Sequence, residues 1–500
     1  MNPFARASVV VRCVVSVAVL LSGGCAMGPD FRQPAAPDAQ QYTRGAQPTA
    51  TASAGGTNGT AQSFAVVPAA PYMWWTTFGC APLDRLVDAA LRNSPTLEAA
   101  RARLRQAEEN YRAEAGQVLL PAVDASLSAT RKQVDLSSVG LPNVASPGPF
   151  TLYDASVSVS YALDLFGANR RALEATRAHV DYDGYELEAA RLTLAGNVVS
   201  AAIRRASLQR QIRLTQEIER YEARRLEIME GRMRAGGLAE FDVRAQRALL
   251  AQTRAALAPL ETQHAQAEHR LAVLTGEAPS VAAFDDIALE AIRLPADLPL
   301  TLPSTLARER PDIRAAEALL HEASANVGVA TANLYPQIVI SAGAGSERRH
   351  IRNLLDSLNV WNVGASLTQP IFHGGALHAQ RRAAMAAYDA ALADYRETVL
   401  GALQQVADVL RALQHDAIAL AERDRAARQQ QGRADIAASR HAAGGISEAE
   451  LIEAQRAALD TLLDRTKAEA DRLSDTAALF QSLGGTPLDG AAPIARKRVR

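Results

Sequence analysis

The sequence His441-Ala-Ala-Gly444-Gly445-Ile446-Ser-Glu448 is the single break in a proline-free run from Ile371 to Thr486. Before this break, apolar residues recur at helical spacing; they are Leu400, Leu403, Val406, Leu410 and Leu413. At about 1.5 Å per residue, a helix of roughly 65 to 70 residues would extend about 100 Å, several times the diameter of a compact domain. The run therefore predicts two rod-like helices that meet at the two glycines.

An earlier segment of the chain repeats this break. Met233-Arg-Ala-Gly236-Gly237-Leu238-Ala-Glu240 resembles it, and Ala245-Gln246-Arg247-Ala248 recurs as Ala454-Gln455-Arg456-Ala457. The offset between the copies is 208 residues at the glycines (444 − 236) and 209 at the glutamines (455 − 246). The chain is therefore predicted to be a tandem duplication of a unit of roughly 200 residues. Its two hairpin tips are predicted at Gly236-Gly237 and Gly444-Gly445.

The composition favours long packed helices over an enzyme core. Charged residues make up 21% of the chain and aromatic residues 5%, and the net charge of −1 gives no reason to expect a nucleic-acid partner. Two of the three cysteines lie within the first 25 residues, which excludes a disulfide framework and leaves Cys80 as a free structural thiol. Phosphate-binding loops, zinc-protease motifs and complete dinucleotide turns are missing from the sequence. We therefore expect no enzyme activity, no metal site and no bound cofactor.

Residues 1–24 read as a lipoprotein signal peptide. Arg6 and Arg12 precede an apolar run, and Leu21-Ser22-Gly23-Gly24-Cys25 resembles a bacterial lipoprotein processing site. Cys25 is therefore predicted to be lipidated, with a covalent diacylglycerol and an acyl chain. The alternative is an ordinary cleaved signal with an incidental cysteine. Acyl chains contribute about 0.8 kcal/mol per buried methylene, so several of them would anchor the chain in a membrane.

The rest of the chain divides into the two repeats and their connections. Residues 25–73 are predicted to form the lipid anchor and an extended linker, because Ala, Thr, Gly, Gln and Pro dominate them without periodicity. The first repeat would follow at 74–279, an inter-repeat linker at 280–301, the second repeat at 302–486 and a C-terminal tail at 487–500. Trp74, Trp75 and Phe78 would open the first repeat as apolar anchors.

Each repeat also contains a predicted β-hairpin, over residues 122–165 and 337–371. After Leu120-Pro121 the apolar residues stop recurring at about 3.6 residues and begin to alternate at 2, as in strands with one apolar and one polar face. Each strand is about 9 to 11 residues long, the length that crosses a bilayer at a tilt. Four strands cannot close a barrel, and open sheet edges cannot face lipid. Several copies of the chain would have to pool their strands, in a number that this argument leaves open.

Short motifs in a fixed order connect these elements to a known family. The motifs are Cys25-Ala-Met-Gly28-Pro29, Trp74-Trp75-Thr-Thr-Phe78, Tyr161-Ala-Leu163-Asp164-Leu165-Phe166-Gly167, Arg310-Pro311-Asp312-Ile313, Gln369-Pro370-Ile371-Phe372 and Leu483-Gly484-Gly485. In this order, and together with the duplication, they resemble the TolC-like outer-membrane factor family. The resemblance is to its lipidated efflux branch (OprM-like, NodT-type).

This resemblance implies an α+β membrane protein of the cell outer membrane. A homotrimer would form a 12-stranded transmembrane β-barrel, four strands per chain, on a long α-helical barrel in the periplasm. Such channels dock onto a periplasmic adaptor (membrane-fusion) protein and an inner-membrane pump, often of the RND class. They are passive conduits for drugs or other small molecules. The alternative is a periplasmic coiled-coil adaptor or structural lipoprotein without a pore.

The resemblance also implies a gate near the hairpin tips. In this branch an acid followed by Ala-Gln-Arg lies at the periplasmic constriction, which here selects Glu453 and Arg456. Glu450, three residues before Glu453, and Asp242 in the first repeat are further candidates. For Glu450 a second role stays open, because Ser447 and Glu450 fit a capping box in which the glutamate returns to the N-cap amide.

Overall fold

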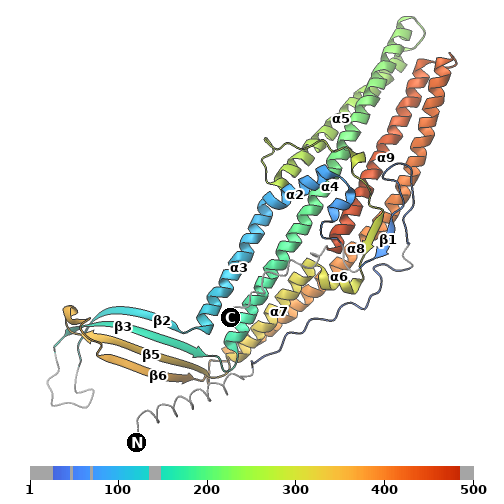
Figure 1. Ribbon diagram of the computed structural model, residues 1–500. Coiled ribbons are helices and arrows are strands. Elements are labelled where there is room, and N and C mark those ends of the chain that lie inside the picture. Colours follow the sequence, from blue (N-terminus) through green and yellow to red (C-terminus); the bar gives the residue numbers. More distant parts are fainter. Residues whose placement is uncertain (1–25, 46–48, 68–70, 135–147, 485–500) are drawn as a thin grey trace. The chain divides into compact units, whose positions relative to one another are not determined.

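The computed structural model describes residues 26–45, 49–67, 71–134 and 148–484 (Figure 1). Cys25, the signal sequence before it and the C-terminal tail lie outside these residues. The chain divides into two compact units. The first comprises residues 1–33, 104–183 and 316–395, and the second comprises residues 34–103, 184–315 and 396–500.

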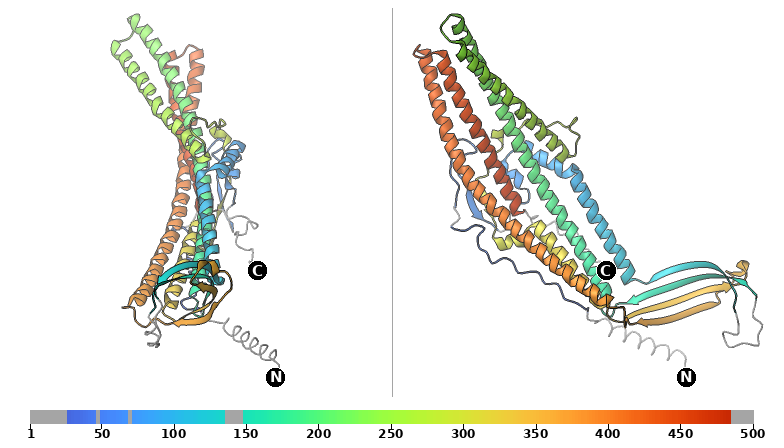
Figure 2. Two further views of the ribbon diagram at one scale, coloured as in Figure 1. Left: turned by 90° about the vertical axis from the view of Figure 1, so that its left-hand side faces the viewer. Right: turned by 180° about the vertical axis from the view of Figure 1, so that it is seen from behind.

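A four-stranded antiparallel sheet in the first unit contains both predicted hairpins. Its order is β2 (Ala122–Lys132), β3 (Phe150–Leu163), β5 (Gln337–Arg348) and β6 (Val360–Thr368), side by side in both views (Figures 1 and 2). The strands lie where the alternation predicts them. The β3–β5 pairing joins the two repeats, and β2 and β6 are left as the outer strands, each with one free edge within the described chain.

Two long helical hairpins repeat with the same dimensions. Helices α4 (Ala168–Arg234) and α8 (Ala376–Ala442) each contain 67 residues, and α5 (Glu240–Thr275) and α9 (Glu448–Leu483) each contain 36. Figure 2 shows each pair running side by side. These equal lengths are what a tandem duplication produces. Of the helices in the described residues, none is long and apolar enough to cross a bilayer.

Shorter helices precede the strands in each repeat. In the first repeat, α2 (Ala81–Asn93) and α3 (Pro95–Leu119) are separated at Ser94, as the Asn-Ser-Pro sequence predicts. The second repeat has α6 (Pro303–Glu309) and α7 (Pro311–Ala332) in the same places. In both repeats a proline begins the second helix, where its missing N–H leaves no bond unmade.

The segments predicted as linkers are extended, but they are fixed in place. Strand β1 (Ser63–Val66) pairs in parallel with β4 (Asp297–Leu300), so the anchor segment and the inter-repeat segment form a small sheet together. A short 3₁₀ helix at Leu289–Ala291 lies just before β4. Composition alone misses this order because the side chains that hold the first segment are polar: Thr51, Asn58 and Gln62 are all buried.

A buried arginine on α9 holds this polar segment. Arg472 is fully buried, and its guanidinium donates to four acceptors: Thr51 Oγ1 (3.0 Å), Asn58 O (3.4 Å), Thr60 O (2.8 Å) and Gln62 Oε1 (3.3 Å). Asn58 also donates to Glu469 of α9 at 2.9 Å, and Gln62 donates to the carbonyl of Pro295 at 3.0 Å. We call Asn58, Gln62 and Arg472 the polar hub.

An aromatic cluster packs on α9 near its C-terminal end, about two turns beyond Arg472. The 3₁₀ helix η1 (Trp74–Phe78) buries Trp74 and Phe78 completely, and Phe480 of α9 stacks on Trp74 with ring centroids 5.6 Å apart. The predicted aromatic anchors therefore pack against the end of the second repeat as well as against α2. Cys80, two residues after Phe78, is buried and free, as predicted.

Phe480→Ala is expected to destabilise the helical part by about 3 to 5 kcal/mol, because it removes a fully buried ring and leaves a cavity. Phe241→Ala is the matched control, since Phe241 is 80% exposed and should change the free energy of unfolding by less than about 0.5 kcal/mol. Chemical denaturation of both variants, followed by circular dichroism, measures the difference. Equal effects would contradict the role given to the cluster.

Candidate gate residues at the helical hairpin tips

The two hairpin tips have the same backbone geometry. Gly236 and Gly444 adopt left-handed φ values of 76° and 73°. In each tip the glycine that follows donates to the carbonyl five residues earlier, as Gly445 N does to Arg440 O at 2.8 Å and Gly237 N to Arg232 O at 2.9 Å. This is the Schellman arrangement, in which a glycine without Cβ strain ends a helix. The glycine pairs are thus explained as helix stops.

After the second tip, a capping box begins α9. The amide of Ser447 donates to Glu450 Oε2 at 2.8 Å, and Ser447 Oγ accepts from the Glu450 amide at 3.3 Å. The backbone hydrogen bond from Ser447 holds the pKa of this exposed glutamate below its usual value. The capping role considered for Glu450 is therefore confirmed, whereas its place at a constriction stays a prediction.

Glu453 and Arg456 come together one turn further along α9. Arg456 Nη2 lies 3.3 Å from Glu453 Oε1, and Nη1 lies 2.9 Å from Asp460 Oδ2. Burial opposes the charged guanidinium, but Asp460, Glu453 and Glu222 outweigh it and raise the pKa of Arg456. The predicted pair thus forms the centre of an ionic ladder on one face of the helix.

The ladder continues onto the first hairpin. Arg456 Nε lies 3.2 Å from Glu222 Oε1 on α4, and Arg225 of α4 forms an ion pair with Glu453. Gln246 of α5 donates to the Glu222 carboxylate and to its backbone carbonyl. We call these five residues the inter-hairpin lock.

The inter-hairpin lock contributes to stability chiefly because one of its carboxylates is buried. The Glu222 side chain is fully buried, whereas that of Arg456 is 25% exposed. An unpaired buried carboxylate costs several kcal/mol, so Arg456 and Gln246 stabilise the Glu222 side chain in its buried position. A more exposed pair, Arg224–Glu448 at 2.8 Å, also joins the hairpins, and its hydrogen bond lowers the pKa of Glu448.

Asp242 takes part in none of the lock's hydrogen bonds or ion pairs within the described chain. It lies in the first turn of α5 beside Glu240, where negative charge complements the helix dipole. Sequence reasoning missed Glu222 and Arg225. Their spacing of three on one helix was a usable signal, but nothing in the sequence places that face against α9.

The two repeats differ at this position. Arg247, the counterpart of Arg456, pairs with Glu230 at 2.6 Å, and the two side chains are 53% and 30% exposed. The duplicated Ala-Gln-Arg motif thus gives a buried inter-hairpin contact in the second repeat and an ordinary pair within the first hairpin.

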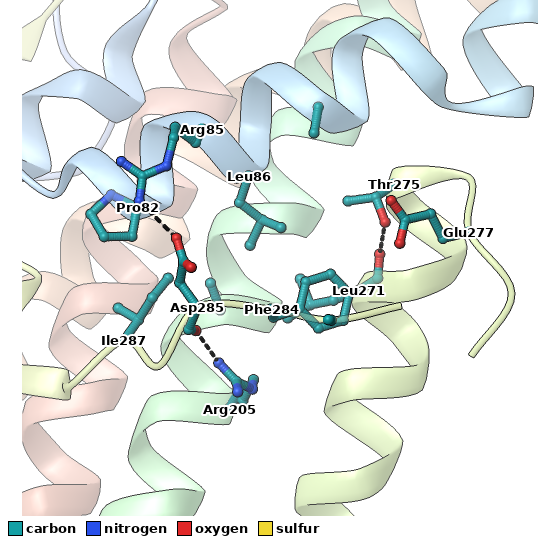
Figure 3. A pocket seen from close by; sticks show the side chains of 13 residues that line it. Pro82, Arg85, Leu86, Arg205, Leu271, Thr275, Glu277, Phe284, Asp285 and Ile287 are labelled. Carbon is teal, nitrogen blue, oxygen red and sulfur yellow. Dashed lines mark hydrogen bonds and ion pairs between the residues drawn. The ribbon is translucent and has the colours of Figure 1, made fainter. Parts of the chain in front are cut away.

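A pocket of about 180 Å³ lies among α2, α4, α5 and the segment that follows α5 (Figure 3). Two of its arginines contact the segment after α5: Arg85 pairs with Asp285 at 2.7 Å, and Arg205 donates to the carbonyl of Asp285 at 2.8 Å. These contacts fasten the segment after α5 to both helices. In the described residues, His, Cys, Asp and Glu side chains form no group of three that could hold a metal ion.

A duplicated chain with two membrane-length strands and one long helical hairpin per repeat defines a class of α+β outer-membrane channel proteins. Residues 86–277 and 302–485 match the family described as outer membrane efflux protein. The chain therefore belongs to that family and has the role of an outer-membrane efflux channel.

Individual relatives agree with this assignment. The pyoverdine export outer membrane protein OpmQ of Pseudomonas putida is 31% identical over 420 residues, which cover 82% of this chain and 87% of OpmQ. The solvent efflux pump outer membrane protein SrpC of Pseudomonas putida is 29% identical, covering 94% of this chain and 97% of SrpC. The outer-membrane channel OprN has a similar structure, with a TM-score of 0.78 and 28% identity over 92% of this chain and 99% of OprN.

Arg456→Ala is expected to lower the free energy of unfolding of the helical part by about 3 kcal/mol, because it leaves Glu222 buried without its cation. Arg247→Ala is the repeat-matched control and should cost less than about 1 kcal/mol, since its pair is exposed. Urea denaturation compares them. A cost for Arg247→Ala as large as that for Arg456→Ala would rule out the distinction between the repeats.

Proposed function

We propose that three copies of this chain form a passive conduit through the outer membrane. The observation that carries the proposal is the four-stranded sheet with two free edges. All eleven residues of β2 and eight of the nine in β6 are exposed in the single chain. Such edges need partners in lipid, and pairing β2 of one copy with β6 of the next would close a barrel. The number three is what the family resemblance implies, and it gives twelve strands.

The two faces of the sheet support this arrangement. One face carries exposed apolar side chains, namely Val123, Leu127, Val157, Trp361, Val363 and Leu367. The other face carries mostly small or polar residues, including the row Asp124, Ser158, Gly343 and Asn362 across all four strands. Transmembrane barrels place an apolar face toward lipid and a polar face toward an aqueous lumen.

The hairpin tips would form the periplasmic gate. In a threefold assembly, the acids near the tips, Glu450 and Glu453 with Asp242 in the first repeat, would occur three times around one axis and favour cations. The lock ties Glu453 and Arg456 to α4, so opening would require these ion pairs to exchange. The chain itself would catalyse no reaction; the energy for transport would come from an inner-membrane pump reached through a periplasmic adaptor.

The transported molecules would be small compounds delivered by that pump. The relatives whose names describe export of pyoverdine or solvents support this class. The runner-up function, a coiled-coil adaptor or structural lipoprotein, provides no reason for two repeats that each supply bilayer-length strands.

Cys25 would carry the lipid anchor in the outer membrane. The residues directly after it are fixed against the strand ends of the first unit: Met27 N donates to Phe166 O at 2.9 Å, and Asp30 pairs with Arg171 of α4 at 2.7 Å. Gly28, at φ 95°, lies close to Gly328 of α7: a Cβ added to Gly28 would be 2.4 Å from the Cα of Gly328. Acyl chains on Cys25 would therefore start beside the ends of the strands.

Single-channel recording in planar bilayers tests the conduit. Discrete, cation-preferring steps are expected from the purified protein, and Glu453→Ala should increase the step size or reduce the cation preference. Glu450→Ala separates capping from gating: a lower stability at unchanged conductance assigns Glu450 to the cap alone. Native mass spectrometry of the same sample gives the copy number. A monomer that never conducts would favour the adaptor function.

Mass spectrometry of the mature protein tests the anchor. The wild-type N-terminal peptide is expected to begin at Cys25 and to carry the mass of a diacylglycerol and an acyl chain. Cys25→Ala should abolish this mass and block processing at that site, whereas Cys13→Ala, a control within the signal sequence, should leave both unchanged. An unmodified Cys25 in the mature protein would refute lipidation.

A further inference from the structure

Two acidic side chains face each other across the second helical hairpin, in a part of the chain that the gate does not use. Asp416 lies on α8 and Asp475 on α9; both are half-buried, and their carboxyl groups are within hydrogen-bonding reach. Asp416 Oδ2 is shielded from solvent and has no hydrogen-bond partner among the described residues. Two ionised carboxylates offer no donor to each other, so a proton is what this contact lacks.

The charges around the pair are few. Arg472 of the polar hub attracts Asp416, and Asp471 of α9 repels it. Asp471 is exposed, and burial and Asp475 raise its pKa, whereas Arg423 of α8 opposes this increase. The segment 49–66, which packs on α9 at the hub, contains no titratable side chain. Burial lowers the pKa of Arg472 to about 10, so it remains charged at neutral pH.

A count of these charges decides which protonation state fits. With a proton on Asp416, the contact carries a single negative charge opposite the Arg472 guanidinium, in addition to the exposed Asp471. Without it, two negative charges face one positive charge in a poorly hydrated place, and the excess charge is unfavourable. The shared proton therefore stabilises the contact between α8 and α9.

We propose that Asp416 and Asp475 form a proton-dependent latch between α8 and α9, which holds the polar hub together below neutral pH and loosens it at alkaline pH. The latch goes beyond the conduit function and does not depend on it. Its effect would be felt first by residues 49–66, because Arg472, which Asp416 attracts, donates hydrogen bonds to that segment.

The direction of the pH effect follows from the pKa. Burial, together with Asp475 and Asp471, raises the pKa of Asp416 from 3.8 to about 7. Since the folded pKa lies above that of the opened state, the stability from the proton is fully present below the lower value and is lost as pH rises through about 7. For a pKa of about 7, the proton-linked stability that is lost between pH 6 and pH 8 corresponds to about a tenfold change in the opening equilibrium.

Hydrogen exchange of the full-length protein in detergent, read by mass spectrometry, tests the latch. After correction for intrinsic exchange, the protection of residues 49–66 should fall about tenfold from pH 6 to pH 8. In this segment the amide of Thr51 donates to Gln62 O at 2.9 Å and that of Phe64 to Thr49 O at 2.9 Å. Asp416→Asn and Asp475→Asn each supply an amide donor in place of the proton, so their protection should stay constant over this range.

Asp435→Asn is the matched control. Asp435 is an exposed α8 carboxylate that accepts from Gln431 at 2.9 Å, and its variant should keep the tenfold fall. The proposal is overturned if wild-type protection is the same at pH 6 and pH 8. It is equally overturned if both asparagine variants retain the full pH dependence. Because exchange is measured without transport, neither result bears on whether the protein conducts.

Discussion

The constraint on which this structure depends is the backbone hydrogen bonding at the two edges of the β2-β3-β5-β6 sheet. Each repeat supplies only a hairpin, and the β3–β5 pairing makes one sheet of the two. Within the residues that the structure describes, β2 and β6 each have one edge that is not paired with another strand. In water such edges would be solvated, but in lipid they must be paired. The apolar face of the sheet favours lipid, and in lipid the open edges would have to pair with further strands.

Duplication explains the helical part as well, but only its framework. The helices have equal lengths in the two repeats, and both tips end in the same glycine geometry. The polar contacts differ: Arg456 reaches a buried glutamate of the other hairpin, whereas its counterpart Arg247 pairs near the surface. Backbone geometry is thus retained from the common unit, while charged contacts distinguish the two hairpins.

The difference between local backbone geometry and charged contacts between distant segments also limits what can be predicted from the sequence. Helices, strands and tips follow from periodicity, proline and glycine, which act locally, so their positions could be predicted. The capping box was also predictable, since Ser447 and Glu450 are three residues apart in sequence. Glu222 and Arg472 could not be assigned, because their partners lie far away in the sequence: Arg456 for the first, and Thr51 to Gln62 for the second. For residues 49–66 composition indicated only an extended segment; it could not show that a buried guanidinium binds these small polar side chains.

The lock and the polar hub are two of the places where buried charge joins segments that are distant in sequence. Apolar contacts would tolerate a slip of one helical turn, since alanine and leucine recur along every helix of this chain. The Arg472 guanidinium, with its four fixed acceptors, does not tolerate such a slip, because the slip would leave a buried cation and several carbonyls unpaired. The lock and the polar hub therefore specify alignment at a cost in desolvation. Where the balance of charge at such a place includes a proton, as between Asp416 and Asp475, alignment becomes sensitive to pH.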